Sequence, residues 1–516
     1  MSTNGLDEFC SRSGRGKAEE QQGGKDVAEN KQTDFLETVR QQIKWGAAWP
    51  GISAELADHL AEHEAQLLAE GVAVEEAEAQ AVQAMGDAAE IGRSLDELHR
   101  PQLAKGLLAL SAVLMAFSLG SMVYAQAQGY PLLLWRTLLG AAGGVVLAVL
   151  LYFADYSKWL RGSAVFYAVG LALPVGVSLL GGTVNGRRIY LSLGSFRVNC
   201  YSLSALLFVA AVVGFLVLWQ NKGLRGLLCC GALAALSVAV VLQGEANLAV
   251  VMAFWYVALF TLVIHWGYFG RRRGLNYGVV YGAVALVWLG IAAFLLTKPS
   301  WLARITGFMH PVENMYGGDW GYASTILTLR QAQWIGPADL SGILSDMSHT
   351  YPAVLVEPMT NYAFMRLIND FGLLAGVLAA GGLLLLLYEG WRKMRQVKNH
   401  YGQLMGLSAL ALLGGQSFCH ILMNLGFYPA TGVSLPFFST GGTNMLVSWL
   451  LLGVILAIWR RNTILLESEP PSENIVKQGE GIVQWSQGRL IIDFGRLLSE
   501  RHVAKQLREG GNRGGY

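Results

Sequence analysis

The sequence LVEPMTNYAFMRLINDFG, residues 355–372, joins a long polar segment to a strongly apolar one. Two acids, Glu357 and Asp370, flank the amide Asn361, which lies where the apolar segment begins. Ionisable and amide side chains at a membrane face cost several kcal/mol of desolvation unless they have partners or a function. We therefore expect this boundary to lie at a membrane surface and to be the first place to look for chemistry.

The composition of the whole chain is that of an integral membrane protein. Hydrophobic residues make up 53% of the 516 residues and charged residues only 14%, a balance that soluble domains rarely show. The net charge of +2 gives no indication of a nucleic-acid partner. The five cysteines lack metal-ligand spacing, and His59 and His63 alternate with acids on a solvated helix face, so no metal site is predicted.

Apolar segments of roughly 17 to 25 residues predict an all-α, polytopic membrane protein with about ten transmembrane helices. If the spans alternate, the basic loops all fall on one side, which the positive-inside rule makes cytoplasmic together with both termini. The other side then carries two longer loops, 182–202 and 297–360. The second of these, between spans seven and eight, exceeds ordinary connections and suggests a function. The predicted spans are 104–125, 131–153, 163–181, 203–220, 224–242, 246–267, 277–296, 361–388, 403–424 and 443–460.

A small cytoplasmic helical domain is predicted at residues 33–100. Thr33 or Asp34 can cap a first helix and Ser53 a second, and a third runs from Val74 to Met85. The phrases QIKW, ELADHL, VQAMGD and HRP resemble the permease-prefix type of domain found ahead of some bacterial membrane proteins. That resemblance implies a regulatory or interaction role and nothing catalytic.

Three further segments complete the predicted organisation. Residues 1–32 have few large apolar side chains and are expected to be disordered, while residues 101–461 form the membrane domain. Residues 462–516 form a cytoplasmic tail. Within this tail, β-like runs at 481–485 and 490–494 predict a hairpin, which on its own is only marginally stable in water.

The phrase TGVSLPFFSTGGT, residues 431–443, is the most specific motif of the chain. Its proline breaks a helix and its paired glycines allow close backbone approach, as expected of a re-entrant segment that lines a cavity. With the ten predicted spans and the long loop, it resembles the FtsW/RodA/SpoVE family. That resemblance implies a protein of the bacterial plasma membrane that polymerises lipid II into glycan strands at the outer face. It also implies a partner, a penicillin-binding transpeptidase or another divisome or elongasome membrane protein.

Other phrases are similar to those of the same family. GRRIYLSLG, residues 186–194, resembles the family's first outside loop, and Glu245 falls where the family has the aspartate of Gln-Pro-Asp. Arg187 and Arg188 violate the positive-inside bias, so they are interpreted as binders of a diphosphate, with interfacial snorkelling as the alternative. Residues 355–361 align with LPE-x-HTD, and Gly372 aligns with the glycine of EELG.

Departures from the family pattern concern the expected chemistry. Asn361 stands where the resemblance implies an aspartate that acts as general base, and an amide cannot take a proton at neutral pH. The family's QPSE-x-x-K phrase is replaced by residues 199–202, and Ala205 stands at the lysine position. The glutamate and the lysine of that phrase are therefore both absent. The cavity has lost a negative and a positive charge together, which leaves neither one unpaired.

Two classes of function remain open on the sequence. As a glycosyltransferase acting on lipid-linked peptidoglycan precursors, the protein needs a substitute base at the Asn361 position, with Glu357 or Glu245 as candidates. A divalent cation that bridges acid and diphosphate fits this function as a cofactor, although no ligand motif in the sequence supports it. As a non-catalytic scaffold, the same cavity binds a lipid-linked precursor or a partner, and a lipid II translocase is a weaker alternative. In each case the substrate-binding residues are Arg187, Arg188, Ser439, Gly441 and Gly442.

Aromatic residues of the long outside loop leave two interpretations open. Trp301, Trp320, Tyr322 and Trp334 can anchor the loop at the membrane interface or line a sugar-binding surface. Interface anchoring is the more common role of such residues.

Overall fold

The structure is a computed structural model of the 516-residue chain. It falls into two units, Met1–Ser468 and Glu469–Tyr516, which are described separately. The described residues are 31–129, 134–184, 187–194, 196–297, 320–339, 359–429, 432–463, 483–486 and 489–492. The predicted disorder of residues 1–32 falls almost wholly outside them.

The expected helical domain before the spans consists of four helices. Phe35, Val39, Ile52, Leu56 and Leu60 form its core, which is the helical spacing of apolar residues that the sequence shows. The helices are residues 31–42, α2 (Trp49–Ala69), α3 (Val74–Met85) and α4 (Ala88–His99), with a short helical turn, η1 (Gly46–Ala48), before α2.

The predicted helix starts were wrong, although α3 has the expected bounds. Residues 31–42 are already helical, so Thr33 and Asp34 lie inside the helix rather than at its start. The second helix begins at Trp49, ahead of Ser53, because a proline in the first turn costs no hydrogen bond. A fourth helix was missed; the Asp87 side chain caps it by accepting a hydrogen bond from the Ala89 amide, at 3.1 Å.

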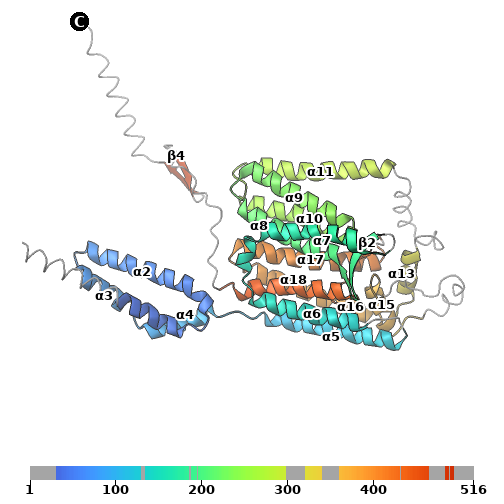
Figure 1. The fold of residues 1–516 in the computed structure, drawn as a ribbon, viewed down its shortest axis with the longest axis horizontal. Helices are drawn as coiled ribbons and strands as arrows, with labels where there is room; N and C mark the ends of the chain where they lie inside the picture. The colour runs from blue at the N-terminus through green and yellow to red at the C-terminus, as the bar shows by residue number, and fades with distance from the viewer. Residues whose placement is uncertain are drawn as a thin grey trace, which may run out of the picture. The chain divides into compact units, whose positions relative to one another are not determined.

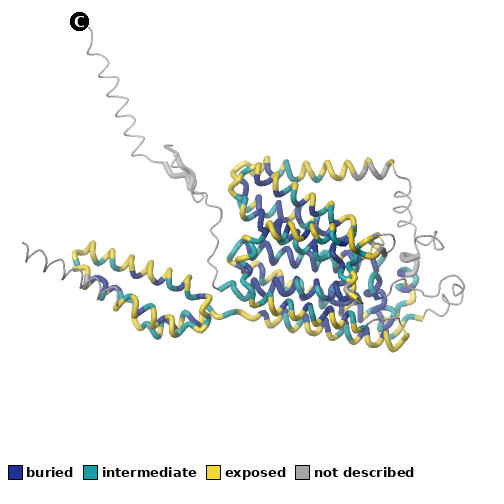
Figure 2. Tube along the Cα trace, in the orientation of Figure 1, coloured by how far each residue is buried: buried dark blue, intermediate teal, exposed yellow. Residues whose placement is uncertain are grey.

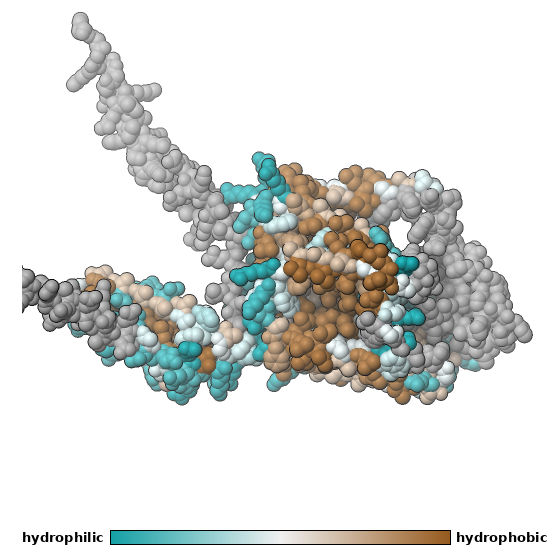
Figure 3. Space-filling view, in the orientation of Figure 1, coloured by the Kyte–Doolittle hydropathy of each residue, from teal (hydrophilic) through white to brown (hydrophobic). Residues whose placement is uncertain are grey.

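The all-α polytopic membrane fold is confirmed. Among the described residues, nine helices are long and apolar enough to cross a membrane, and α11 (Arg273–Thr297) lies where the seventh span was predicted. The helices pack side by side (Figure 1), and Figure 3 shows an apolar band across them with hydrophilic residues along one edge. The nine are α5 (Lys105–Ala127), α6 (Leu134–Phe153), α7 (Ser163–Leu180), α8 (Cys200–Leu218), α9 (Gly223–Leu242), α10 (Ala246–His265), α16 (Leu373–Met394), α17 (His400–Asn424) and α18 (Gly442–Arg460).

The predicted span 361–388 is not one helix. It is divided at Gly372 into α15 (Ala363–Phe371) and α16. Gly372 has φ 94°, a left-handed conformation that interrupts the helix and that residues with a Cβ avoid. With nine residues α15 is only about 13 Å long, so α16 alone crosses the membrane.

A small antiparallel sheet, which the all-α prediction omitted, forms in the loop between α7 and α8. Its strands β1 (Gly182–Val184), β2 (Arg187–Leu193) and β3 (Phe196–Asn199) pair in sequence order. Ile189 and Leu191 pack against Val177 and Cys200, so this sheet rests on α7 and α8. The connections between the long helices also contain α13 (Trp320–Arg330) in the long loop and η2 (Tyr156–Leu160) between α6 and α7.

The second unit contains the predicted hairpin of the tail. Strands β4 (Val483–Ser486) and β5 (Arg489–Ile492) pair antiparallel, with Val483 opposite Ile492. The two short strands predicted on either side of a Gln-Gly turn are confirmed.

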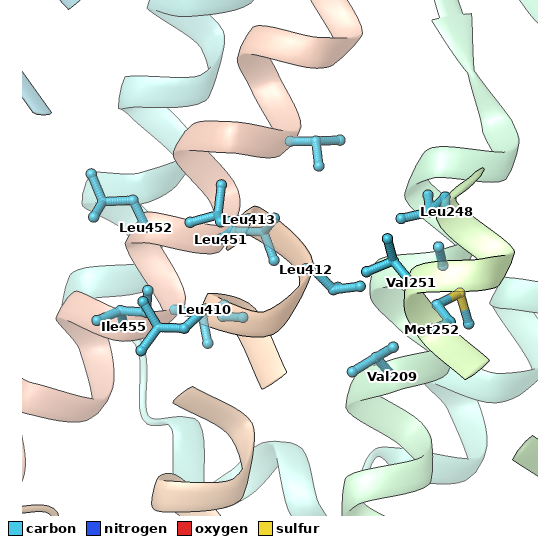
Figure 4. Packing of buried hydrophobic residues seen from close by; sticks show 14 of the residues in the cluster. Val209, Leu248, Val251, Met252, Leu410, Leu412, Leu413, Leu451, Leu452 and Ile455 are labelled. Carbon is cyan, nitrogen blue, oxygen red and sulfur yellow. The ribbon is translucent and has the colours of Figure 1, made fainter. Parts of the chain in front are cut away.

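The centre of the bundle is α18. In its apolar window 78% of the residues are buried, against 28% in α6 and 33% in α16 (Figure 2). Small residues let α6 approach α18 closely: a Cβ on Gly140 would lie 2.3 Å from the Gly442 Cα, and one on Gly453 would lie 2.7 Å from the Ala148 Cα. On the other side, α17 packs against both α18 and α10, and its Leu412 belongs to the same buried cluster as Val251 and Met252 of α10 (Figure 4).

Gly140→Ala tests this close approach. The added methyl group overlaps Gly442 backbone atoms, so it should force α6 and α18 apart and cost about 1–3 kcal/mol of stability. Thermal unfolding in detergent should show a clearly lowered midpoint. Gly143→Ala is the matched control, because nothing lies within 4 Å of a Cβ at that position of the same helix. Equal midpoints for the two variants would contradict the packing described.

Candidate functional site

The loop between α17 and α18 folds back onto the start of α15. Ser439 is fully buried; its hydroxyl donates to the Thr360 carbonyl and accepts from the Leu435 amide, both at 2.7 Å. Thr440 donates to the Met359 carbonyl from both its amide and its hydroxyl, each at 2.8 Å. Residues 359 and 360, just before Asn361, are thus held by side-chain and backbone hydrogen bonds rather than by a helix.

The same loop carries local backbone strain. Phe437 has φ 66°, which is unusual for a large side chain, and its carbonyl accepts a 2.6 Å hydrogen bond from Ser118 of α5. Such a conformation costs on the order of 1–3 kcal/mol and persists only where the surroundings impose it. The loop therefore has one defined shape, held from α5 as well as from α15.

Two polar side chains of α17, His420 and Asn424, hold the other side of α15. His420 Nε2 accepts from the Phe364 amide at 3.4 Å and its Nδ1 lies 2.8 Å from the Val433 carbonyl, so the proton belongs on Nδ1. Asn424 accepts from the Met365 amide at 2.9 Å and donates to the Asn361 carbonyl at 3.1 Å. Neither residue was predicted from the sequence, although polar residues four apart in an apolar span are a signal for such a role.

The Asn361 side chain faces Gly432 of the loop. A Cβ on Gly432 would lie 3.6 Å from Asn361 Oδ1 and 3.9 Å from Nδ2. From α10, the Asn247 amide reaches the Gly432 carbonyl at 3.5 Å. Gly432 therefore lies between Asn361 and the start of α10.

Glu245 lies directly before α10, outside the membrane-spanning helices. Its half-buried carboxylate accepts a hydrogen bond from the Asn199 side chain, and Asn199 in turn donates from its backbone to Thr443 of α18 at 3.0 Å. Burial raises the pKa of Glu245 to about 7, although the hydrogen bond from Asn199 opposes this shift. The carboxyl therefore titrates near neutral pH. It lies two residues before Asn247, whose amide reaches Gly432 next to Asn361.

The other described acid near Asn361, Asp370, has a structural role. It forms a buried ion pair with Arg366 at 3.1 Å, with side chains only 5% and 1% exposed. Arg366 also donates to the Ser121 carbonyl at 3.1 Å and to its hydroxyl at 2.9 Å, which ties α15 to α5. Of the two acids in the segment 355–372, Asp370 is therefore neutralised by a cation one helical turn away.

The predicted diphosphate binders lie on β2. Arg188 is exposed and donates to the Ser178 carbonyl at 2.8 Å, whereas the side chain of Arg187 lies outside the described residues. Arg188 pairs with Thr183 and Arg197 with Ser192, so both arginines share one face of the sheet by strand alternation. Arg197 was missed because it belongs to none of the recognised phrases.

The remaining predicted residues shape the loop. Gly441 donates its amide to Thr137 at 3.4 Å, and Gly442 provides the close contact with α6. The Ser439 hydroxyl both donates and accepts a hydrogen bond within the protein. Substrate binding by Ser439, Gly441 and Gly442 therefore stays a prediction. Ala205, at the lysine position, is 1% exposed in the apolar core. Glu357 lies outside the described residues, and among those described no group of three His, Cys, Asp or Glu could hold a metal ion.

Comparison with known proteins agrees with this architecture. Residues 101–464 match the model of the FtsW/RodA/SpoVE family, described as cell cycle proteins. Stage V sporulation protein E of Bacillus subtilis is 24% identical over 334 residues, 63% of this chain and 86% of that protein. A probable peptidoglycan glycosyltransferase FtsW of Coxiella burnetii is 26% identical over 366 residues, 68% of this chain and 93% of that protein.

A solved structure shares the fold. It describes how a peptidoglycan synthase complex coordinates polymerization and crosslinking, and one of its chains superposes with a TM-score of 0.57 at 21% identity. The match covers 69% of this chain and 97% of that chain. At this level of identity the likeness establishes the architecture of the bundle.

Breaking the buried ion pair should strongly destabilise the site. Asp370→Ala leaves the Arg366 cation buried without its acid, at a cost of about 3–5 kcal/mol in unfolding free energy. Replacing both residues, by Arg366→Met with Asp370→Leu, should recover most of that loss. Thermal unfolding in nanodiscs measures both.

Glu389→Ala is the matched control for this comparison. It removes the acid of a more exposed pair with Arg392, which should cost less than about 1 kcal/mol. An Asp370→Ala variant as stable as Glu389→Ala would contradict the structural role of the buried pair.

Proposed function

Because the chain belongs to the FtsW/RodA/SpoVE family, we propose that it acts on a lipid-linked peptidoglycan precursor at the outer face of the bacterial plasma membrane. A role in cell-wall synthesis follows from the family, whose relatives include probable peptidoglycan glycosyltransferases. Both termini are placed in the cytoplasm, because the basic loops between the helices then lie inside. Asn361, just before α15, then lies on the side where the glycan is built.

The reaction we propose is glycosyl transfer with Glu245 as general base. The observation that carries this proposal is a carboxyl of pKa about 7, hydrogen-bonded to Asn199 and two residues before Asn247, whose amide reaches Gly432 beside Asn361. A base works best when its pKa lies near the operating pH, and Glu245 meets this condition. Asn361 can orient the attacking sugar hydroxyl through its amide, while Glu245 accepts the proton.

Arg188 and Arg197 supply the complementary charge for the leaving group. They share one face of the outside sheet, and guanidinium groups suit phosphate oxygens through paired hydrogen bonds. The distance between their positions, about four residues along a strand, is roughly 14 Å, which two extended side chains can bridge around a diphosphate. Glycosyl transfer would release that diphosphate on the polyprenyl carrier.

A second function, non-catalytic binding of the same precursor, is favoured by one specific observation. The family's acid position carries an amide, and its lysine position is an alanine buried in the apolar core. A pocket changed in this way can still bind a lipid-linked precursor and act as a scaffold. In both cases we propose a penicillin-binding transpeptidase as the partner, because glycan strands require cross-linking after polymerisation.

Polymerisation of fluorescent lipid II by the purified protein separates the two functions. The wild type should make glycan strands, and Glu245→Gln should lower the rate by roughly 10²–10⁴-fold, since it removes the base and keeps the shape. Glu389→Gln, at the opposite end of the bundle, should leave the rate unchanged. Gel analysis of the glycan products measures each rate.

Other outcomes of this assay lead elsewhere. Loss of activity in Glu357→Ala, with Glu245→Gln active, would assign the base to Glu357. An inert wild type that binds lipid II and gains activity as Asn361→Asp would support the scaffold function. An inert wild type with no binding would contradict both.

The pH dependence has a defined sign. A carboxyl is protonated below its pKa, so a base with pKa about 7 is lost as the pH falls. The value of kcat/KM should therefore drop about tenfold for each pH unit below about 7 and level off above it. A flat profile between about pH 5 and 8 would exclude Glu245 as the base.

A further inference from the structure

The turn Gln333–Gly336 lies in the long outside loop after α13. Two large apolar side chains of this turn are exposed on the protein surface. Trp334 is 73% exposed and Ile335 is 74% exposed. They follow each other at the tip of a short non-helical segment, so neither is covered by the described part of the chain. Burial of two such side chains would contribute roughly 1.5–3 kcal/mol each, which makes their exposure to water unfavourable.

The backbone of this turn is already hydrogen-bonded to the α15–α16 junction. The Gln333 carbonyl accepts from the Leu373 amide at 2.8 Å and the Trp334 carbonyl from the Leu374 amide at 3.1 Å. In the reverse direction the Gly336 amide donates to the Phe371 carbonyl at 3.1 Å. A non-helical segment can enter the apolar part of a membrane only when its backbone polar groups are satisfied in this way.

The turn continues a surface that faces lipid. Leu374, Val377 and Leu378 on the first two turns of α16 are 43%, 61% and 59% exposed, as expected of a membrane helix. Charged residues flank the turn, with Arg330 exposed at the end of α13 and Asp339 exposed beyond the tip. The apolar tip and its charged flanks fit a segment that enters a membrane only to the headgroup boundary.

We propose that Trp334 and Ile335 insert into the outer leaflet beside α16 and anchor the long loop to the membrane. The occupant of this surface is lipid, because the surface is continuous with the lipid-facing side of α16 and because Trp is favoured at the boundary of headgroups and acyl chains. The anchor is independent of the reaction proposed for Glu245. It also covers Gly372, where a Cβ would lie 2.7 Å from the Trp334 carbonyl.

The proposed anchoring acts on the position of Asn361 through the junction between α15 and α16. The turn holds the junction where α15 ends, and the start of α15 follows directly after Asn361. A loop fixed in the membrane at this point sets the depth of α15 relative to the headgroups. The hydrogen bonds between the turn and the α15–α16 junction hold α15 at that depth.

Spin labels in the full-length protein reconstituted in phosphatidylglycerol/phosphatidylethanolamine vesicles test the proposal. The parent carries Cys10→Ser and Cys229→Ala, since Cys229 is exposed while Cys200, Cys230 and Cys419 are buried. Labels are placed at Trp334→Cys and at Ile335→Cys, and the second variant keeps Trp334. Power saturation then compares the accessibility of each label to oxygen and to a water-soluble nickel chelate.

Matched positions define the two limits. Val377→Cys reports a lipid-facing site on α16, and Gln331→Cys reports an exposed polar site beside the turn. The oxygen-to-nickel ratio at 334 and 335 should be several-fold above that at 331 and no higher than that at 377. A ratio equal to that at 331 would contradict the proposal and favour a water-exposed sugar surface, and inaccessibility to both reagents would contradict it in favour of a protein partner.

Discussion

Internal hydrogen bonding of the chain around Asn361 is the constraint on which the rest of the site depends. Inside a membrane domain, backbone groups outside helices must find partners in the protein. The segment 359–365 finds them in Ser439 and Thr440 of the loop and in His420 and Asn424 of α17. Because these bonds run to separate elements, the start of α15 has one position, and the Asn361 side chain is directed toward Gly432.

Two acids of the membrane domain show how their partners decide their roles. Asp370 meets the Arg366 guanidinium one helical turn away, so its charge is neutralised in a buried ion pair. Glu245 meets the amide of Asn199, which stabilises its charge far less than a cation would, so burial keeps its pKa near neutrality. An acid that exchanges its proton near pH 7 is suited to proton transfer, and a paired acid is suited to holding a helix in place.

The sequence was sufficient to predict the long membrane helices, because apolar length acts over whole helices. The spans, the helical domain and the tail hairpin follow from patterns of many residues. The division at Gly372 was not predicted, since it depends on the left-handed backbone of one glycine and on carbonyls of residues 333 and 334 that lie some forty positions earlier. The partners His420, Asn424 and Arg197 were missed for a similar reason, because side-chain contacts between distant segments leave only a faint local signal.

Glu245 is the residue on which the proposed chemistry depends, and its protonation can be observed directly. Infrared spectra of the reconstituted protein, recorded across pH and compared with those of Glu245→Gln, isolate the stretch of its protonated carboxyl. This band should disappear with a midpoint near pH 7 as the carboxylate forms. A midpoint near the ordinary glutamate value of 4.5 would show a carboxylate that is fully ionised at neutral pH and too weak a base for the proposed role.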